Sequence, residues 1–99
     1  MRLDKYLQIT GLIKRRVLAN EACKRGLVTV NSVAAKPTRE VASGDVIELS
    51  LAKRQLTVKV LKEITGNSLK KTLRPEYFEI LQDSEKDEDI NDNFWSDDE

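Results

Sequence analysis

Basic side chains are concentrated near the N-terminus of this chain, and their chemistry is suited to binding phosphate. Residues 2–25 contain seven lysines and arginines but only two acids, Asp4 and Glu21. With so few acids these bases are not the alternating ion pairs of an ordinary solvated helix, and arginine can bond phosphate through two parallel N–H groups. We therefore predict contact with a nucleic-acid backbone. The candidate contacts are Arg2, Lys5, Arg15, Arg16, Asn20 and Lys24.

Other residues in the same region have two possible roles each. Asp4 is expected either to hold a neighbouring guanidinium in place or only to stabilise the start of a helix. Tyr6 could stack on a base, or it could pack in the core because it lies three residues after Leu3. Asn20 could bond RNA or cap a local backbone group. Cys23 is interpreted as a small residue fitted into a helix rather than as a reactive thiol.

Catalysis, cofactor binding and metal binding have little support in the residue inventory. The chain has no histidine and a single cysteine, so the commonest general base and the commonest zinc-ligand sets are missing. Its four glycines stand apart and form no phosphate-binding loop. We predict a protein that is not an enzyme and has no cofactor and no metal.

The net charge of zero conceals two oppositely charged regions. Residues 1–81 contain 16 lysines and arginines against 8 acids, whereas residues 82–99 contain one lysine against 9 acids. A basic region attracts polyanions, because each neutralised phosphate releases counterions. An acidic segment with little to bury is expected to be disordered. The predicted division is a folded RNA-binding domain over 1–81 and a disordered tail over 82–99, whose polarity is broken by Phe94-Trp95.

The length and composition are those of one small domain without a membrane segment. The chain has 99 residues, of which 39% are hydrophobic, enough for one modest core. No run approaches the ~20 apolar residues of a membrane helix, and the first residues do not resemble a secretory signal. We expect a cytoplasmic protein.

Hydrophobic spacing predicts two helices, a small sheet and a third helix. Leu18 and Ala22 define the core face of the second helix, which leaves Arg16, Asn20 and Cys23 on the opposite face. Asn31-Ser32 and Gly44-Asp45 are predicted turns. The expected helices cover about 3–10, 14–24 and 75–81, and the expected strands cover 27–30, 33–36, 46–49 and 54–61. The fold class is α+β.

The motifs, in this order, resemble the S4 RNA-binding domain. They are Met1 to Leu7, Gly11 to Ala19, Gly26 to Asn31, Ala35-Lys36-Pro37 and Gly44 to Leu49. The resemblance covers residues 1 to about 50 and implies a helix pair packed on a small, bent β-sheet.

Within that superfamily, Met1 to Lys5 and the Lys14-Arg15-Arg16 cluster look most like the RqcP family, which is related to the heat-shock protein fifteen family. This resemblance implies binding to large ribosomal subunits that still carry peptidyl-tRNA, contact with large-subunit rRNA and tRNA, and support for an alanine-tailing factor. It favours Arg2, Lys5, Arg15 and Arg16 as contacts. Lys14 and Lys36 join Asp4 and Tyr6 as supporting residues, and the protein is expected to be a monomer off the ribosome.

Three alternatives accompany this interpretation. The chain could be a general rRNA- and tRNA-binding assembly or heat-shock factor. It could be the RNA-binding part of a modifying enzyme, although 99 residues are not expected to hold a catalytic domain as well. It could also be a protein-interaction adaptor that acts through its acidic tail.

Overall fold

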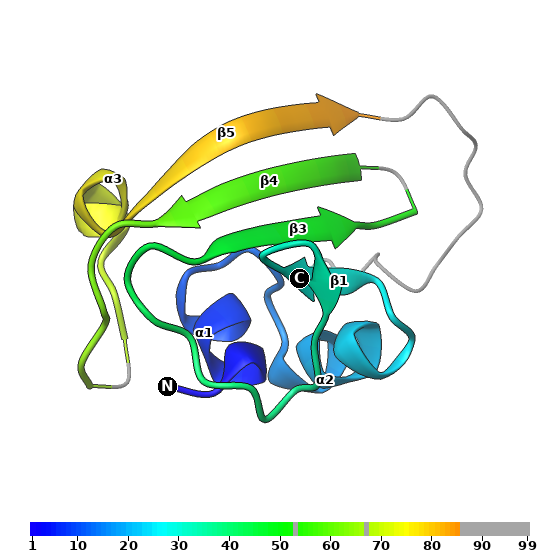
Figure 1. Cartoon of the computed structure of the whole chain (residues 1–99). Helices are drawn as coiled ribbons and strands as arrows, with labels where there is room; N and C mark the ends of the chain where they lie inside the picture. The colour runs from blue at the N-terminus through cyan, green and yellow to red at the C-terminus, as the bar shows by residue number, and fades with distance from the viewer. Residues whose placement is uncertain (53, 67, 86–99) are drawn as a thin grey trace.

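A computed structural model describes residues 1–52, 54–66 and 68–85, and its architecture is α+β (Figure 1). Two helices cover one face of an antiparallel sheet with strand order β2-β1-β3-β4-β5. The helices are α1 (Leu3–Ile9), α2 (Arg16–Lys24), the 3₁₀ turn η1 (Lys71–Leu73) and α3 (Arg74–Tyr77). The strands are β1 (Val28–Val30), β2 (Val33–Ala34), β3 (Val46–Ser50), β4 (Arg54–Val60) and β5 (Phe78–Glu85). No helix among the described residues is long and apolar enough to cross a membrane.

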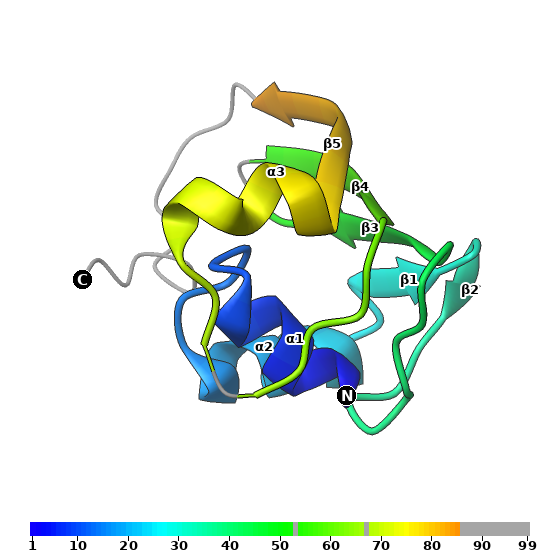
Figure 2. The same ribbon diagram turned by 90° about the vertical axis from the view of Figure 1, so that its left-hand side faces the viewer.

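The first helix was expected to end near residue 10, and α1 does end there, with Thr10 as its C-cap. The buried Thr10 hydroxyl donates to the carbonyl oxygen of Tyr6 at 2.8 Å, and the same oxygen accepts the Thr10 backbone N–H at 3.0 Å. Gly11 follows with φ +80°, a conformation that other residues adopt at a cost. Ile13, just beyond it, is buried. This turn brings α2 back against α1 (Figure 2).

The hairpin of β1 and β2 turns through Asn31 and Ser32, as predicted. Both residues have positive φ, 54° and 72°, which matches the right-handed twist of the flanking strands. Asn31 is further held by Asp45, whose Oδ1 accepts its side-chain amide N–H at 3.1 Å. The strand expected over 54–61 is present as β4, in which Leu56, Val58 and Val60 are buried and alternate with more exposed residues.

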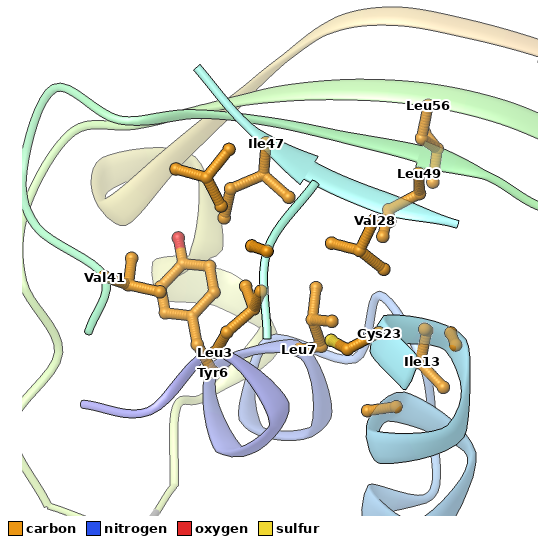
Figure 3. Packing of buried hydrophobic residues seen from close by; sticks show 14 of the residues in the cluster. Leu3, Tyr6, Leu7, Ile13, Cys23, Val28, Val41, Ile47, Leu49 and Leu56 are labelled. Carbon is orange, nitrogen blue, oxygen red and sulfur yellow. The ribbon is translucent and has the colours of Figure 1, made fainter. Parts of the chain in front are cut away.

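The core lies between the helix pair and the sheet. The side chains of Leu3 and Leu7 on α1 are fully buried and meet Val28, Ile47 and Leu49 of the sheet in one apolar cluster (Figure 3). Full burial of such a side chain contributes roughly 1.5–3 kcal/mol. The position of α1 on the sheet is therefore fixed by its apolar stripe.

The C-terminal part differs from the sequence prediction. A helix over 75–81 was expected, but α3 ends at Tyr77 and β5 begins at Phe78, so that prediction is wrong. The expectation that no structure continues past residue 81 is wrong for 82–85, which pair with β4. The physical reason is that β4 has an open edge, whose backbone groups gain a full ladder of partners from β5. The rest of the acidic tail, with Phe94-Trp95, lies outside the described residues.

Residues 36–41, which follow β2, cross the start of α1 and tie it to the sheet. The Leu3 N–H donates to the Arg39 carbonyl at 2.8 Å, and the Val41 N–H donates to the Met1 carbonyl at 2.9 Å. The N-terminal ammonium of Met1 adds a 2.8 Å ion pair with Glu40. These bonds fix the direction in which the first two residues of the chain enter α1.

Candidate nucleic-acid interface

A buried carboxylate joins the two N-terminal helices at the predicted binding surface. Asp4 is 2% exposed and accepts a hydrogen bond from Arg2 Nη2 at 3.1 Å and one from Asn20 Nδ2 at 3.2 Å. Arg16 Nη2 lies 3.6 Å from its other oxygen. Residues that are 16 positions apart in the chain therefore share one anchor. The expectation that Asp4 pairs with a nearby arginine is confirmed.

The surroundings of Asp4 favour its charged form. Burial opposes ionisation, but the Asn20 hydrogen bond, the Arg16 charge, the backbone N–H of Lys5 and the Arg2 charge outweigh it, so the pKa of Asp4 is lowered. Asp4 therefore carries a full negative charge at neutral pH. The two guanidinium groups are held beside it while about half of each side chain stays exposed, 44% for Arg2 and 46% for Arg16.

Helical spacing extends this arrangement along α2. Arg16, Asn20 and Lys24 are four residues apart and so lie on one face of the helix. The opposite face is packed into the core through Ala19 and Ala22. The outer face contains a shallow hollow, which is lined by Asp4, Arg16, Val17, Asn20, Glu21 and Lys24. An RNA strand could approach this hollow closely because no large aromatic side chain stands in it.

The remaining predicted contacts lie around this hollow. Lys5 follows the anchor and gives its backbone N–H to Asp4 at 2.8 Å, while its side chain is half-buried. Arg15 is exposed as the residue before α2, and Lys14 is exposed next to it. Lys36 is exposed beside Pro37, whose carbonyl accepts the Asp4 N–H at 3.2 Å. The backbone of Lys5 contacts Asp4 and Lys36 is next to a residue that does, whereas Lys14 and Arg15 directly precede α2.

The structure decides between the two roles considered for Tyr6, in favour of the core, and shows that the outward placement of Cys23 is wrong. Tyr6 is 1% exposed and packs beside Leu3 and Val41 (Figure 3), so its ring is not available to stack on a base. Burial raises its pKa. Cys23 does not share the outer face of α2 with Asn20. It is 5% exposed, in the core, and burial and the nearby Asp4 charge raise its pKa to about 11. A small, uncharged side chain was expected there, and that interpretation is confirmed.

Sequence reasoning missed the contribution of residues 36–41 to this surface. The Glu40 side chain binds the N-terminal ammonium, and the backbone of Glu40 forms an isolated β-bridge with Arg2. The backbone of Arg2 is therefore held in place. No local sequence pattern predicts a contact between two residues that are 38 positions apart. Among the described ranges, no three carboxylate or thiol side chains come together as a metal site requires.

Comparison with known proteins identifies the family. A protein named RQC P-site tRNA stabilizing factor, from Listeria innocua, is 40% identical over 88 residues, which cover 89% of this chain and 94% of the relative. The protein of that name from Halalkalibacterium halodurans is 41% identical over 91 residues, covering 92% and 97%. The chain belongs to the RQC P-site tRNA stabilizing factor family. The predicted relationship to RqcP is confirmed.

Two further similarities agree with membership of the RQC P-site tRNA stabilizing factor family. The S4 domain matches residues 1–47, which span both N-terminal helices and reach into β3. The structure of heat shock protein 15 from Vibrio cholerae has a TM-score of 0.70 and 26% identity, and covers 81% of this chain and 80% of its own. The expected helix pair on a small bent sheet is confirmed.

Proposed function

We propose that this chain is a non-catalytic RNA-binding factor that acts in ribosome-associated quality control. In this proposal it binds large-subunit rRNA and peptidyl-tRNA on obstructed large subunits and supports C-terminal alanine tailing by a partner protein. It works in the cytoplasm, is a monomer off the ribosome and needs no cofactor. The name of its relatives supports the tRNA and quality-control parts of this proposal.

One observation carries the RNA-binding part: Arg2 and Arg16, from separate helices, share the buried Asp4. Each guanidinium has five N–H donors, and Asp4 occupies few of them. Arg16 lines the same hollow as Lys24, and Arg2 is 44% exposed beside Asp4. Together the three cations outnumber the two carboxylates of the hollow, Asp4 and Glu21, and offer a pre-positioned set of donors to phosphate oxygens.

The kind of RNA follows from this geometry. Helical RNA has a narrow, deep major groove that side chains cannot read, so proteins recognise it through shape, phosphates and 2′-hydroxyls. The surface around Asp4 is polar and cationic, and Tyr6 is too buried to stack on an unpaired base. We therefore assign backbone recognition of folded rRNA and tRNA to Arg2, Lys5, Arg15, Arg16, Asn20 and Lys24, with Lys14 and Lys36 in support.

The test is sedimentation of the protein with purified large subunits over a series of salt concentrations. Arg16→Ala is expected to bind more weakly at every salt concentration. Losing one phosphate contact should also reduce the slope of log affinity against log salt by about 0.7–0.9. Lys59→Ala is the matched control. It removes one positive charge from an exposed β4 position whose neighbours Val58 and Val60 point into the core.

Equal losses for Arg16→Ala and Lys59→Ala would mean that only net charge matters, and the assigned surface would be wrong. Circular dichroism of both variants confirms that the fold is intact. Comparing empty large subunits with subunits that carry peptidyl-tRNA then separates a quality-control factor from a general rRNA-binding factor. Binding that is indifferent to the tRNA would contradict the quality-control proposal.

A further inference from the structure

A second concave site lies away from the Asp4 surface, between the α1–α2 turn and the outer strands of the sheet. It is a cavity of about 670 Å³, within the ~300–1,000 Å³ typical of binding sites for small organic groups. Its walls include Leu12 from the turn and Leu56, Phe78 and Ile80 from β4 and β5. Ile80 is 47% exposed, so this cavity presents apolar surface to solvent.

The polar side chains of this cavity are Thr10, Arg54, Glu79 and Arg74, and Arg74 lies at the start of α3. Its guanidinium lies against Gly11, where an added Cβ would overlap it. Its Nε is buried and has no hydrogen-bond partner among the described residues. A buried donor of this kind normally has an acceptor, since leaving it unpaired costs about 1–3 kcal/mol. The site therefore combines an apolar wall with an arginine whose buried Nε has no acceptor within the described part of the chain.

We propose that this cavity binds the chain's own C-terminal segment, residues 86–99. Phe94 and Trp95 insert against Ile80 and Leu56, and a neighbouring carboxylate of the segment accepts from Arg74. This inference is independent of RNA binding. It gives a role to the one aromatic pair in a segment that otherwise consists mainly of acids and other polar residues.

The position and length of the segment support this occupant. Glu85, the last described residue, pairs in the sheet with Arg54, which lines the cavity. The nine residues from Lys86 to Phe94 can span at most ~30 Å, so the aromatic pair can reach the apolar wall without unfolding any strand. A tethered segment also binds at a high effective concentration, which favours it over a free peptide.

Charge and chemistry argue against RNA in the same cavity. Arg54 is already engaged by Asp83 through two bonds of 2.9 and 2.8 Å, so Arg74 is the principal cation left for a ligand there. Apart from Thr10 and Glu79 the rest of the lining is largely apolar, and the Glu79 carboxylate repels phosphate, so the cavity suits aromatic side chains with a single carboxylate at Arg74 rather than a phosphate backbone. Residues 87–99 contain seven acids around Phe94-Trp95.

Trp95 makes the proposal directly measurable because it is the only tryptophan in the chain. Fluorescence of the full-length protein is expected to show an emission maximum at shorter wavelength than the same protein in urea. Acrylamide should quench the native emission less steeply. Dilution of the protein should leave the emission unchanged, since the docking is within one molecule.

Two neighbouring positions on β5 give a matched pair of variants. Ile80→Lys places a charge in the cavity and should shift Trp95 emission to longer wavelength. Leu81→Lys is the control, because Leu81 is 50% exposed on the same strand but does not line the cavity. Ile80→Thr keeps a β-branched side chain suited to a strand, and should give a smaller shift in the same direction if the lysine variant folds poorly.

Native emission identical to that in urea overturns the proposal. So does a blue shift that survives both Ile80 substitutions, because Trp95 would then be buried elsewhere. A blue shift that grows with protein concentration would place Trp95 in a second copy and would also overturn it. A red shift in the Ile80 variants, none in Leu81→Lys, and insensitivity to dilution together support docking in this cavity.

Discussion

Replacing Asp4 with asparagine tests whether this carboxylate holds the two helices and their arginines together. The substitution keeps the size of the side chain, and one oxygen can still accept from the Lys5 N–H. The new amide, however, turns a donor toward the donors of Arg2 or Asn20. The variant loses the charge on a hydrogen-bonded group, and hydrogen bonds to charged groups contribute about 1.5–3 kcal/mol.

The exposure of the partners limits the size of this loss. Arg2 and Arg16 are nearly half exposed, so solvent screens their attraction to Asp4. Asn20 and the Lys5 N–H are more shielded, and they determine most of the effect. We therefore expect Asp4→Asn to lower the free energy of unfolding by about 2 kcal/mol at pH 7, which corresponds to roughly 8–16 °C in Tm for a domain of this size.

The pH dependence of this difference provides an independent check. The pKa of Asp4 is lower in the folded protein than its ordinary value of 3.8. Its contribution is therefore complete above that value and is lost as the pH falls through the lower, folded pKa. The gap between wild type and Asp4→Asn should be full at pH 7 and should narrow below roughly pH 4. Asparagine cannot titrate, so this pH dependence comes from the wild-type protein.

Urea unfolding followed by circular dichroism at several pH values measures this gap. Asp83→Asn is the control, because it removes a carboxylate from another arginine pair at an exposed site and should cost less. If Asp4→Asn unfolds at the same urea concentration as wild type, Asp4 does not anchor the helices. A gap of constant size down to low pH would show that the effect comes from shape and not from charge.

Two further predictions concern single residues outside the anchor. Cys23 is buried with a pKa raised to about 11, so its thiol should react with a disulfide reagent at pH 8 far more slowly in the native protein than in urea; equal rates would contradict its burial. Ser32 has φ 72° in an exposed turn, so Ser32→Gly should raise the free energy of unfolding by up to about 1 kcal/mol, and a lower Tm would contradict the turn assignment.

The N-terminal half could be predicted largely because its signals are local. Thr10-Gly11 and Asn31-Ser32 mark turns through backbone conformations that few residues favour. The alternation in β4 fixes which face is buried, because a shift of one residue would reverse it. The four-residue spacing of Arg16, Asn20 and Lys24 likewise places them on one face of any helix that contains them.

The errors arose where distant contacts decide the structure. The stretch that begins at Phe78 has residues compatible with a helix, and only the open edge of β4 makes a strand preferable. Cys23 was placed outward by its angle from Leu18, yet α2 buries Ala19, Ala22 and Cys23 and leaves Leu18 half-buried. The orientation of a helix with few large apolar residues depends on its neighbour, here α1, which the pattern of α2 alone does not contain.

A carboxylate at the centre of the proposed RNA-binding surface needs a physical reason, since it reduces the positive charge that attracts phosphate. The gain is order. An arginine side chain carries about 2 kcal/mol of rotamer entropy, and immobilising it at the moment of binding weakens affinity by part of that amount. Asp4 restricts Arg2 and Arg16 already in the free protein, within a fold that buries the carboxylate, while Lys24 and Lys5 restore the positive balance. Such a surface favours an RNA whose phosphates match the fixed positions of the guanidinium groups. It attracts RNA in general less strongly, but it discriminates better between RNAs of different shape.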